Sequence, residues 1–212
     1  MGSFSGSFPE GSLFSGKKGG DKMILLTGFA PFDGDKLNPS WEAVKGVRAL
    51  PGFEKKVDIL ELPVVFGQAA EKALAQIRLL RPSAVVCVGL AGGRKAVTPE
   101  VIAVNLKHAR IPDNGGNQPQ WEKILPEGPD GIFSRLPVRE MADALNAAGI
   151  PGALSFSAGT YVCNEVMYRV LHDYQGPAGF IHVPKCLEQG GEMPLREMTD
   201  ALAKCVSLLF TP

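Results

Sequence analysis

The stretch ALSFSAGTYVCNEVMYRVLHDYQGPAGFIHV, residues 153–183, passes from a short apolar run through a polar loop into a segment of helical period, and then into a second apolar run. Two apolar runs joined by a helix are typical of a βαβ unit, in which both strands lie parallel in one sheet. The stretch therefore predicts strands at 153–157 and 179–183, with a helix at 163–174 between them.

The same alternation runs through the chain from Met23 onward. Further strands are predicted at 23–27, 56–62, 83–89 and 100–106, and further helices at 39–50, 67–80, 138–148 and 194–209. Strands as apolar as these suit a sheet that is covered by helices on both faces. We predict an α/β protein of three layers, α/β/α, built around a largely parallel, twisted central sheet.

Two segments depart from this alternation. Residues 1–22 are rich in Gly and Ser and lack an apolar core, so we interpret them as a flexible leader or expression scar. The single domain is then expected to span 23–212. The segment 107–135 is dense in Pro, Gly, Asn and Asp, and we expect a long excursion or small hairpin that borders the site or a subunit contact.

Composition excludes several classes of partner. The 212 residues carry 22 basic and 22 acidic side chains, so no overall field would draw the protein to nucleic acid or to an anionic membrane. The longest apolar stretches fall well short of the roughly 20 residues of a membrane span. The four cysteines are scattered without metal-site spacing, which favours reduced thiols in a cytoplasmic protein without metal or cofactor. Cys87 and Cys205 are predicted to be core, whereas Cys186 follows a strand and could be exposed.

One cysteine and one histidine are predicted to meet at the carboxyl edge of the sheet, where open α/β sheets bind ligands. Cys163 enters the predicted helix, and His182 lies near the end of the strand that follows, 19 residues further on. A thiol at a helix N-terminus beside an imidazole is favoured as a thiolate, which a cysteine nucleophile needs. Cys163 as a small buried hydrophobe and His182 as an ordinary core residue remain alternatives.

A third polar group would fix the tautomer of the imidazole. Glu100 is the first candidate, because an acid at the head of an apolar strand needs a partner if it is buried; its alternative is a surface carboxylate. Asp113 is the second candidate. His108 in a polar loop and His172 near the end of its helix are weaker candidates for a base.

Two loops at strand ends bear on ligand binding. The loop TGFAPFDG, residues 27–34, presents Phe29 and Phe32, which serve either as packing or as the wall of a pocket. The glycines of VGLAGGRK, residues 88–95, let backbone N–H groups approach a ligand, as oxyanion donors or as a phosphate cradle. The loop lacks GxGxxG spacing and the lysine–serine pair of a P-loop, so it gives little support to a nucleotide site.

Five blocks in this order, GFAPFDGDKLNPS, TPEVIAVN, ARIPDNGGNQP, GTYVCN and FIHVP, make the chain closely resemble the pyroglutamyl peptidase I family of cysteine peptidases. The resemblance runs from about Met23 to the C-terminus. It implies a phosphorylase/hydrolase-like α/β fold without a metal, and removal of an N-terminal pyroglutamyl residue from peptides through a thioester acyl-enzyme. Members of this family commonly assemble as tetramers, and dimers and monomers also occur.

The resemblance also implies roles for individual residues. By their motifs, Cys163 matches the nucleophile, His182 the general base and Glu100 the acid that orients it. The residues that the resemblance assigns to substrate binding are Phe29 and Phe32 of GFAPF, Arg110 of ARIPDN, and Tyr161 and Val162 beside the nucleophile.

The chain also departs from the family at three positions. Leu90 stands in the glycine-rich loop where the family usually has glutamine, and Lys185 and Cys186 follow HVP where more apolar residues are usual. These departures leave two alternatives open, a member with an altered substrate and a binding protein without turnover. A nucleotide hydrolase or phosphorylase that uses VGLAGGR as an anion cradle is a third.

Overall fold

The computed structural model describes residues 23–210, in which strands and helices alternate along most of the chain. The strands within this range are β1 (Ile24–Phe29), β2 (Val57–Leu62), β3 (Ala84–Leu90), β4 (Thr98–Pro99), β5 (Ile102–Val104), β6 (Gly131–Phe133) and β7 (Ala178–Val183). The helices are α1 (Pro39–Ala49), α2 (Gln68–Leu80), α3 (Val138–Ala147), α4 (Val162–Asp173) and α5 (Leu195–Ser207), with a short 3₁₀ turn at Leu187–Gln189.

Five of these strands form the central sheet, in the order β2-β1-β3-β7-β4. The first four strands in this order are parallel, and β4 runs antiparallel to β7. In this register His182 on β7 lies between Gly89 on β3 and Thr98 on β4. The carboxyl ends of the parallel strands therefore meet at one edge, and His182 lies close to that edge inside the sheet.

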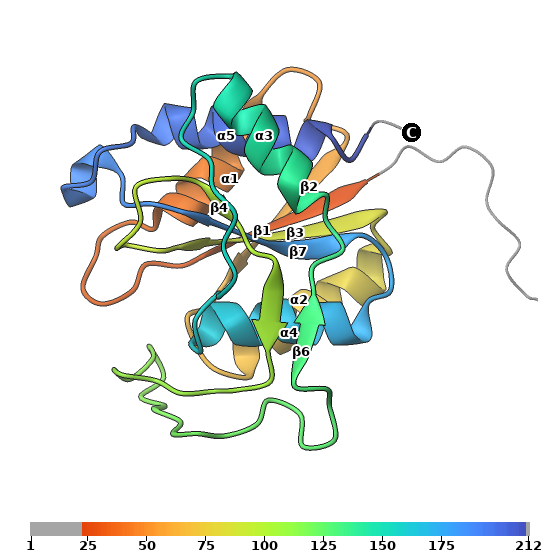
Figure 1. Cartoon of the computed structure of the whole chain (residues 1–212), viewed down its shortest axis with the longest axis vertical. Helices are drawn as coiled ribbons and strands as arrows, with labels where there is room; N and C mark the ends of the chain where they lie inside the picture. The colour runs from red at the N-terminus through yellow and green to blue at the C-terminus, as the bar shows by residue number, and fades with distance from the viewer. Residues whose placement is uncertain (1–22, 211–212) are drawn as a thin grey trace, which may run out of the picture.

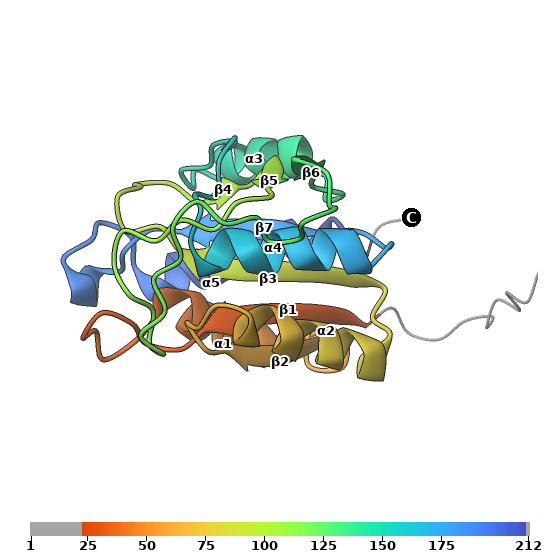
Figure 2. The same cartoon turned by 90° about the horizontal axis from the view of Figure 1, so that it is seen from below.

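Helices α1, α3 and α5 cover one face of the sheet, and helices α2 and α4 cover the other (Figure 1). Each face has its own apolar cluster, with the strand side chains alternating between the two. Strands β5 and β6 pair with each other outside the central sheet, on the side of the molecule where β7 lies (Figure 2). The result is a sheet closed on both faces, with its carboxyl edge left for loops.

Local sequence fixes how helix α1 leaves strand β1. Asn38 caps the helix, since its side chain accepts a hydrogen bond from the Ser40 backbone N–H at 3.1 Å. The Ser40 hydroxyl in turn accepts from the backbone N–H of Phe29 at 3.0 Å. The start of the helix is thus tied to the end of the strand, and the loop between them is held at the carboxyl edge.

The predicted fold class is confirmed, and so are the five predicted helices and the strands predicted at 23–27, 56–62, 83–89 and 179–183. Their ends differ from the prediction by one or two residues, as is usual for fraying termini. The excursion expected at 107–135 is present and contains β6, which pairs with β5. The leader interpreted at 1–22 lies outside the described residues.

The strand predicted at 153–157 is wrong. This segment makes isolated bridges, such as Glu100 with Ser155, and no continuous ladder. Its neighbour β4 is only two residues long, and Pro99 has no N–H to extend the pairing. The βαβ unit proposed for residues 153–183 is therefore reduced to helix α4 followed by strand β7.

The strand predicted at 100–106 is also wrong as one element. The chain pairs with β7 through β4, and the backbone N–H of Glu100 still donates to Phe180 O at 2.9 Å. It then leaves the central sheet, and β5 pairs with β6 over helix α4, where Asn164 accepts from the N–H of Val104 at 2.9 Å. The segment predicted as one strand at 100–106 thus pairs with β7 at its start and with β6 further on.

Candidate active site

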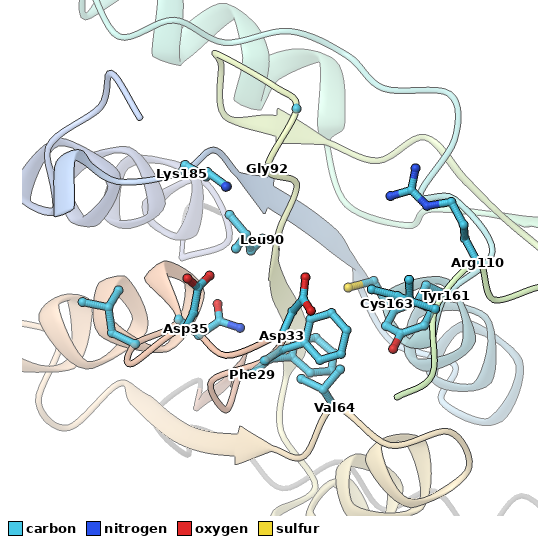
Figure 3. Close-up of a pocket in the computed structure, with 15 residues that line it drawn as sticks. Phe29, Asp33, Asp35, Val64, Leu90, Gly92, Arg110, Tyr161, Cys163 and Lys185 are labelled. Carbon is cyan, nitrogen blue, oxygen red and sulfur yellow. The ribbon is translucent and has the colours of Figure 1, made fainter. Parts of the chain in front are cut away.

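A cavity of about 430 Å³ opens at the carboxyl ends of strands β1 and β3 (Figure 3). Its wall is contributed by the loop after β1, the end of β3 and the loop that follows it, the 110–111 loop, the start of α4, and Lys185 after β7. The side chains that matter below are Phe29, Phe32, Asp33, Asp35, Leu90, Arg110, Tyr161, Cys163 and Lys185. This is the position at which open α/β sheets bind ligands.

Cys163 lies at the second position of helix α4, with its sulfur pointing into the cavity (Figure 3). The helix can approach strand β3 because Gly89 has no side chain there. A Cβ on Gly89 would lie 3.0 Å from Cys163 Sγ and 2.7 Å from the ring of Phe180. Since Gly89 is also the register partner of His182, the thiol and the imidazole are brought to the same part of the sheet edge.

His182 is held by Glu100. The Nδ1 atom of His182 lies 2.6 Å from Glu100 Oε1, and both side chains are almost completely removed from solvent. A carboxylate only accepts hydrogen bonds, so Nδ1 carries the hydrogen and Nε2 of the neutral ring is left free to accept a proton. The structure thus brings together Cys163, His182 and Glu100, the three residues predicted to form a catalytic triad.

The surroundings set which of these groups is charged. Burial lowers the pKa of His182 against the opposing effect of Glu100, which favours the neutral ring. Burial by itself would raise the pKa of Glu100, but the hydrogen bond and charge of His182, with polar contacts from Ser155 and Arg94, outweigh it and lower that pKa. The pair therefore consists of a carboxylate and a neutral imidazole.

The expected thiolate is wrong for the resting protein. Burial, followed by the charge of Glu100, raises the pKa of the Cys163 thiol to about 12. Its place at the helix N-terminus and its own backbone N–H act in the opposite direction but do not prevail. The resting site thus holds a neutral thiol beside a neutral imidazole, and a thiolate would form only when a base removes the proton.

A fourth residue in this network, Arg94, was missed by the sequence analysis. Its Nη1 lies 2.6 Å from Glu100 Oε1 and also donates to Thr98 Oγ1, and its Nη2 donates to the carbonyl of Ser157 at 2.9 Å. Arg94 comes from the glycine-rich loop that had been considered only for its backbone. The available signal was the buried acid itself, because a fully buried carboxylate needs a cation or several donors.

Aromatic rings enclose the end of the cavity nearest Cys163. Tyr161 packs against Phe32, with ring centroids 5.5 Å apart, and against Phe66 at 5.2 Å. The hydroxyl of Tyr161 donates to the carbonyl of Pro112 at 3.0 Å, which fixes the ring. Phe29 is almost fully buried beneath this end. Three of the predicted substrate-binding side chains, Phe29, Phe32 and Tyr161, therefore line one apolar surface.

The other two predicted substrate-binding residues differ from each other. Arg110 lines the mouth of the cavity and is exposed. The Val162 side chain is fully buried in the apolar cluster between the sheet and helices α2 and α4. The Val162 side chain therefore does not line the cavity, and a substrate-binding role of Val162 stays a prediction that concerns its backbone at the start of helix α4.

Comparison with known proteins agrees with this geometry. Residues 22–200 match the family model described as pyroglutamyl peptidase. The chain belongs to the pyroglutamyl peptidase family. A pyrrolidone-carboxylate peptidase from Yersinia pestis is 41% identical over 192 residues, 88% of this chain and 89% of the relative. One from Levilactobacillus brevis is 50% identical over 171 residues, 78% of this chain and 83% of the relative.

Solved structures of the pyroglutamyl peptidase family share the fold. Pyroglutamyl peptidase I from Bacillus amyloliquefaciens is 38% identical, with a TM-score of 0.84, and the match covers 91% of this chain and 96% of that one. Pyrrolidone carboxyl peptidase from Pyrococcus furiosus is 36% identical, with a TM-score of 0.81, over 88% of this chain and 97% of that one.

Two of the three departures from the pyroglutamyl peptidase pattern lie at one side of the cavity, and the third is buried in the core. Leu90 and Lys185 line the wall together with Asp35, opposite Cys163 and Tyr161 (Figure 3). Cys186, for which exposure had been left open, is fully buried, and its thiol lies 3.6 Å from Gln189 Oε1. The backbone turns inward after β7 and places this thiol in the cluster under helices α1 and α5. Cys87 and Cys205 are core residues, as predicted.

Asp113 and His172, the alternative acid and one of the two alternative bases, make their hydrogen bonds away from His182. Asp113 accepts hydrogen bonds from the backbone N–H groups of Phe66, Gly115 and Asn117, so it holds a loop and is not the partner of His182. His172 lies in the last turn of α4 beside Asp173, 2.5 Å from its carboxylate.

Two further properties concern the part of the chain that the structure describes. No cluster of three or more His, Cys, Asp or Glu side chains between residues 23 and 210 is arranged to hold a metal ion. In the same residues no helix has the length and apolar character needed to cross a membrane.

Proposed function

We propose that this member of the pyroglutamyl peptidase family is a cysteine exopeptidase that removes an N-terminal L-pyroglutamyl residue from peptides, with Cys163 as nucleophile, His182 as general base and Glu100 as the orienting acid. The observation that carries the proposal is the contact of His182 Nδ1 with the buried Glu100 at 2.6 Å, beside a thiol that faces the cavity. The names of the relatives support the same substrate.

The aromatic end of the cavity supports recognition of the pyroglutamyl ring. Pyroglutamate is a flat, neutral lactam without a free α-amine, so it needs apolar contact and a few hydrogen-bonding groups. Phe29, Phe32 and Tyr161 offer such a surface next to the sulfur of Cys163. A ring bound there would present the carbonyl that follows it to the thiol.

The charge states of the site support a concerted proton transfer. As Cys163 Sγ attacks the carbonyl carbon, its proton passes to Nε2 of His182, and the resulting imidazolium is stabilised by the Glu100 carboxylate. The protonated His182 then gives this proton to the leaving amine, which leaves a thioester on Cys163. Water, activated by the neutral imidazole, hydrolyses the thioester and releases pyroglutamate.

The start of helix α4 supports stabilisation of the tetrahedral intermediate. The first N–H groups of a helix have no acceptor within the helix, and Cys163 lies at its second position. These groups and the positive end of the helix dipole face the region where the oxyanion would form. Val162 and Cys163 would contribute through the backbone, whatever their side chains do.

Hydrolysis of a fluorogenic pyroglutamyl amide tests the proposal. We expect thiol-dependent turnover of this substrate, and no turnover of the matched prolyl amide, which keeps the five-membered ring but has a charged amine and no ring carbonyl. Cys163→Ala should abolish activity, whereas Cys205→Ala, which alters a buried thiol in helix α5, should keep it. Full activity of Cys163→Ala, or equal turnover of both amides, would show the proposal to be wrong.

A second candidate is the same reaction with an altered preference for the residue after the ring. Leu90, Asp35 and Lys185 lie on the side of the cavity away from the aromatic rings, where the leaving peptide would extend. The residues that depart from the family there are therefore expected to alter the preference for the leaving peptide, and not the recognition of the pyroglutamyl ring. Comparing kcat/KM over pyroglutamyl dipeptides with apolar, acidic and basic second residues decides between a broad and a narrowed preference.

The setting of the protein is part of the proposal. Four free cysteines among the described residues favour a reducing compartment, the cytoplasm.

Large exposed apolar side chains, among them Trp121, Phe133 and Phe156, favour assembly into a homo-oligomer, a dimer or a tetramer. Light scattering coupled to size exclusion would give the mass of the assembly, and a mass of about 22.6 kDa would contradict it.

A further inference from the structure

We propose that Arg94 is a positioning residue of this site, which holds Glu100 against His182 and fixes the adjoining wall of the cavity. The inference rests on the proposed function, because it assigns His182 the part of the base. Its starting point is geometric: one guanidinium group contacts Glu100, Thr98 and the carbonyl of Ser157.

Arg94 joins three segments that are separate in the sequence. It stands in the loop after β3, Thr98 and Glu100 belong to the β4 segment, and Ser157 belongs to the loop that leads into α4. The planar fork of an arginine can satisfy such divergent acceptors at once, whereas the single ammonium of a lysine cannot. These contacts tie the Glu100 side chain to the loop after β3 and to the loop before α4, in addition to its contact with His182.

One oxygen atom of Glu100 contacts both His182 and Arg94. Glu100 Oε1 lies 2.6 Å from Nδ1 of His182 and 2.6 Å from Nη1 of Arg94. The carboxylate has no exposed surface, while the arginine side chain is 27% exposed. Arg94 therefore reaches Glu100 from the solvent side and adds to the larger effect of His182, which already opposes the burial of the carboxylate.

Sharing this oxygen also limits how strongly Glu100 attracts a proton to His182. The charged and titratable groups that face His182 are Glu100 after β4 and Arg94 from the loop after β3, and the Cys163 thiol of α4 faces Glu100 in turn. The charge of Arg94 lowers the pKa of His182, and Glu100 raises it, both on top of the larger lowering by burial. Removing Arg94 leaves the Glu100 charge unopposed, so the pKa of His182 should rise.

The same residue orders part of the substrate cavity. Gly92 and Gly93 line the cavity immediately before Arg94, and the backbone N–H of Arg94 closes a turn onto Ala91 O at 3.0 Å. Because the guanidinium group is fixed on the β4 segment, this short loop has a defined position. Loss of Arg94 should therefore affect KM as well as kcat.

The next residue in the chain provides a matched control. Lys95 also carries one positive charge, but its Nζ pairs with Glu192 at 2.6 Å, and both side chains are largely exposed. Lys95→Met removes the same charge from the same loop without touching Glu100. Arg94→Met removes the charge and the fork together, and Arg94→Lys keeps the charge while losing most of the contacts.

Two measurements on the full chain test the proposal. The first is kcat and KM across pH for wild type, Arg94→Met, Arg94→Lys and Lys95→Met. The second is the pKa of His182, followed by NMR of histidine-labelled protein, in which only three histidines contribute signals. The NMR titration needs no turnover, so it still judges Arg94 if the wild type fails to cleave pyroglutamyl substrates.

In Arg94→Met we expect kcat to fall about 10- to 100-fold, as for other residues that orient a reacting side chain. The acidic limb of the kcat profile and the NMR pKa of His182 should both move to higher pH. In Arg94→Lys, kcat and the His182 pKa should lie between those of wild type and Arg94→Met. Lys95→Met should match wild type in both measurements.

An Arg94→Met protein that is less stable, but has unchanged kcat and an unchanged His182 titration, would give Arg94 a structural role only and overturn the proposal. Equal losses in Arg94→Met and Lys95→Met would overturn it as well. If Arg94→Met does not fold, Arg94→Lys decides by the same titration, and a wild-type kcat and His182 pKa in that variant would contradict a role for the fork.

Discussion

Glu100 and Glu165 are both buried, yet their surroundings affect the two carboxyl groups in opposite ways. Glu100 is completely buried beside strand β7, where His182 and Arg94 lower its pKa despite the burial. Glu165 in helix α4 is 4% exposed, and burial raises its pKa. Its Oε2 accepts one hydrogen bond, from the backbone N–H of Gly67 at 2.7 Å.

The difference shows that partners, and not burial alone, decide in which direction the pKa of an enclosed carboxyl group moves. A backbone N–H with cations at a greater distance does not offset the loss of water around Glu165. A touching guanidinium and an imidazole N–H do offset it around Glu100. The surroundings of Glu165 are adequate for packing a helix. The surroundings of Glu100 keep a negative charge beside His182, where a protonated imidazole would need it.

Replacing each glutamate by glutamine should give the largest contrast. Glu100→Gln keeps the shape but removes the charge and disturbs the tautomer of His182, and we expect kcat to fall by about 10³ to 10⁴-fold. Glu165→Gln, whose carbonyl can still accept from the N–H of Gly67, should keep kcat within about twofold. Steady-state kinetics on a pyroglutamyl amide measure both, and a comparable loss in the two variants would remove the distinction.

The stability of the same two variants should depend on pH with opposite slopes. The folded pKa of Glu100 is below 4.5, so its contribution is present above pH 4.5 and disappears as the pH falls through the folded value. The folded pKa of Glu165 is above 4.5, so its contribution is complete below pH 4.5 and is lost as the pH rises through the folded value.

Urea unfolding between acidic and slightly alkaline pH measures these slopes. The advantage of wild type over Glu100→Gln should grow with pH, by about 1–3 kcal/mol for a buried charged hydrogen bond. The advantage over Glu165→Gln should shrink with pH, within about 1 kcal/mol for one hydrogen bond. Slopes of the same sign would show that the pKa values of the two carboxyl groups are not shifted in opposite directions.

The sequence could predict most elements around Glu100 and Glu165, because the helices carry apolar stripes and the long parallel strands are rich in apolar residues. It failed at 153–157, where Leu154 and Phe156 suggest a buried strand but are 37% and 71% exposed. An apolar run indicates an extended chain but does not supply a neighbour to pair with. Here that neighbour, β4, ends after two residues.

The three residues of the predicted triad could be found from their motifs, but their setting could not. Whether Cys163 is a thiol or a thiolate depends on burial and on the distance to Glu100, neither of which a motif contains. Arg94 reaches Glu100 only because the loop after β3 folds back onto β4. Glu165, in the middle of an amphipathic helix, gave no sign that it would be enclosed by the turn before α2.

Gly67 allows a further test of the surroundings of Glu165. It has φ 72°, and its N–H donates to Glu165, while a Cβ would meet no atom within 4 Å. Gly67→Ala should therefore cost about 1–2 kcal/mol in unfolding free energy through backbone strain, and leave kcat unchanged.

Gly52 supplies the control for this substitution, since it has φ 88°, open space for a Cβ, and an N–H that donates to the exposed Glu54 at 2.8 Å. Gly52→Ala should show the strain alone. Alanine keeps the backbone N–H, so a loss in Gly67→Ala that does not exceed the loss in Gly52→Ala would mean that the strain at residue 67 leaves its hydrogen bond to Glu165 intact.

The smallest expected effect concerns the cation that acts on Glu165 from a distance. The charge of Lys107 lowers the pKa of Glu165 without a direct contact, and Lys107 itself pairs with Glu122 at 3.4 Å. Lys107→Met should raise the pKa of Glu165 further and lower stability above pH 4.5 by less than about 0.5 kcal/mol at low salt. Glu122→Gln breaks the same exposed pair but keeps the lysine, so it should leave the pH dependence unchanged. A stability loss in Lys107→Met that persists in 1 M salt would mean that the lysine contacts Glu165 directly. Lys107 would then act on Glu165 as Arg94 acts on Glu100, only more weakly.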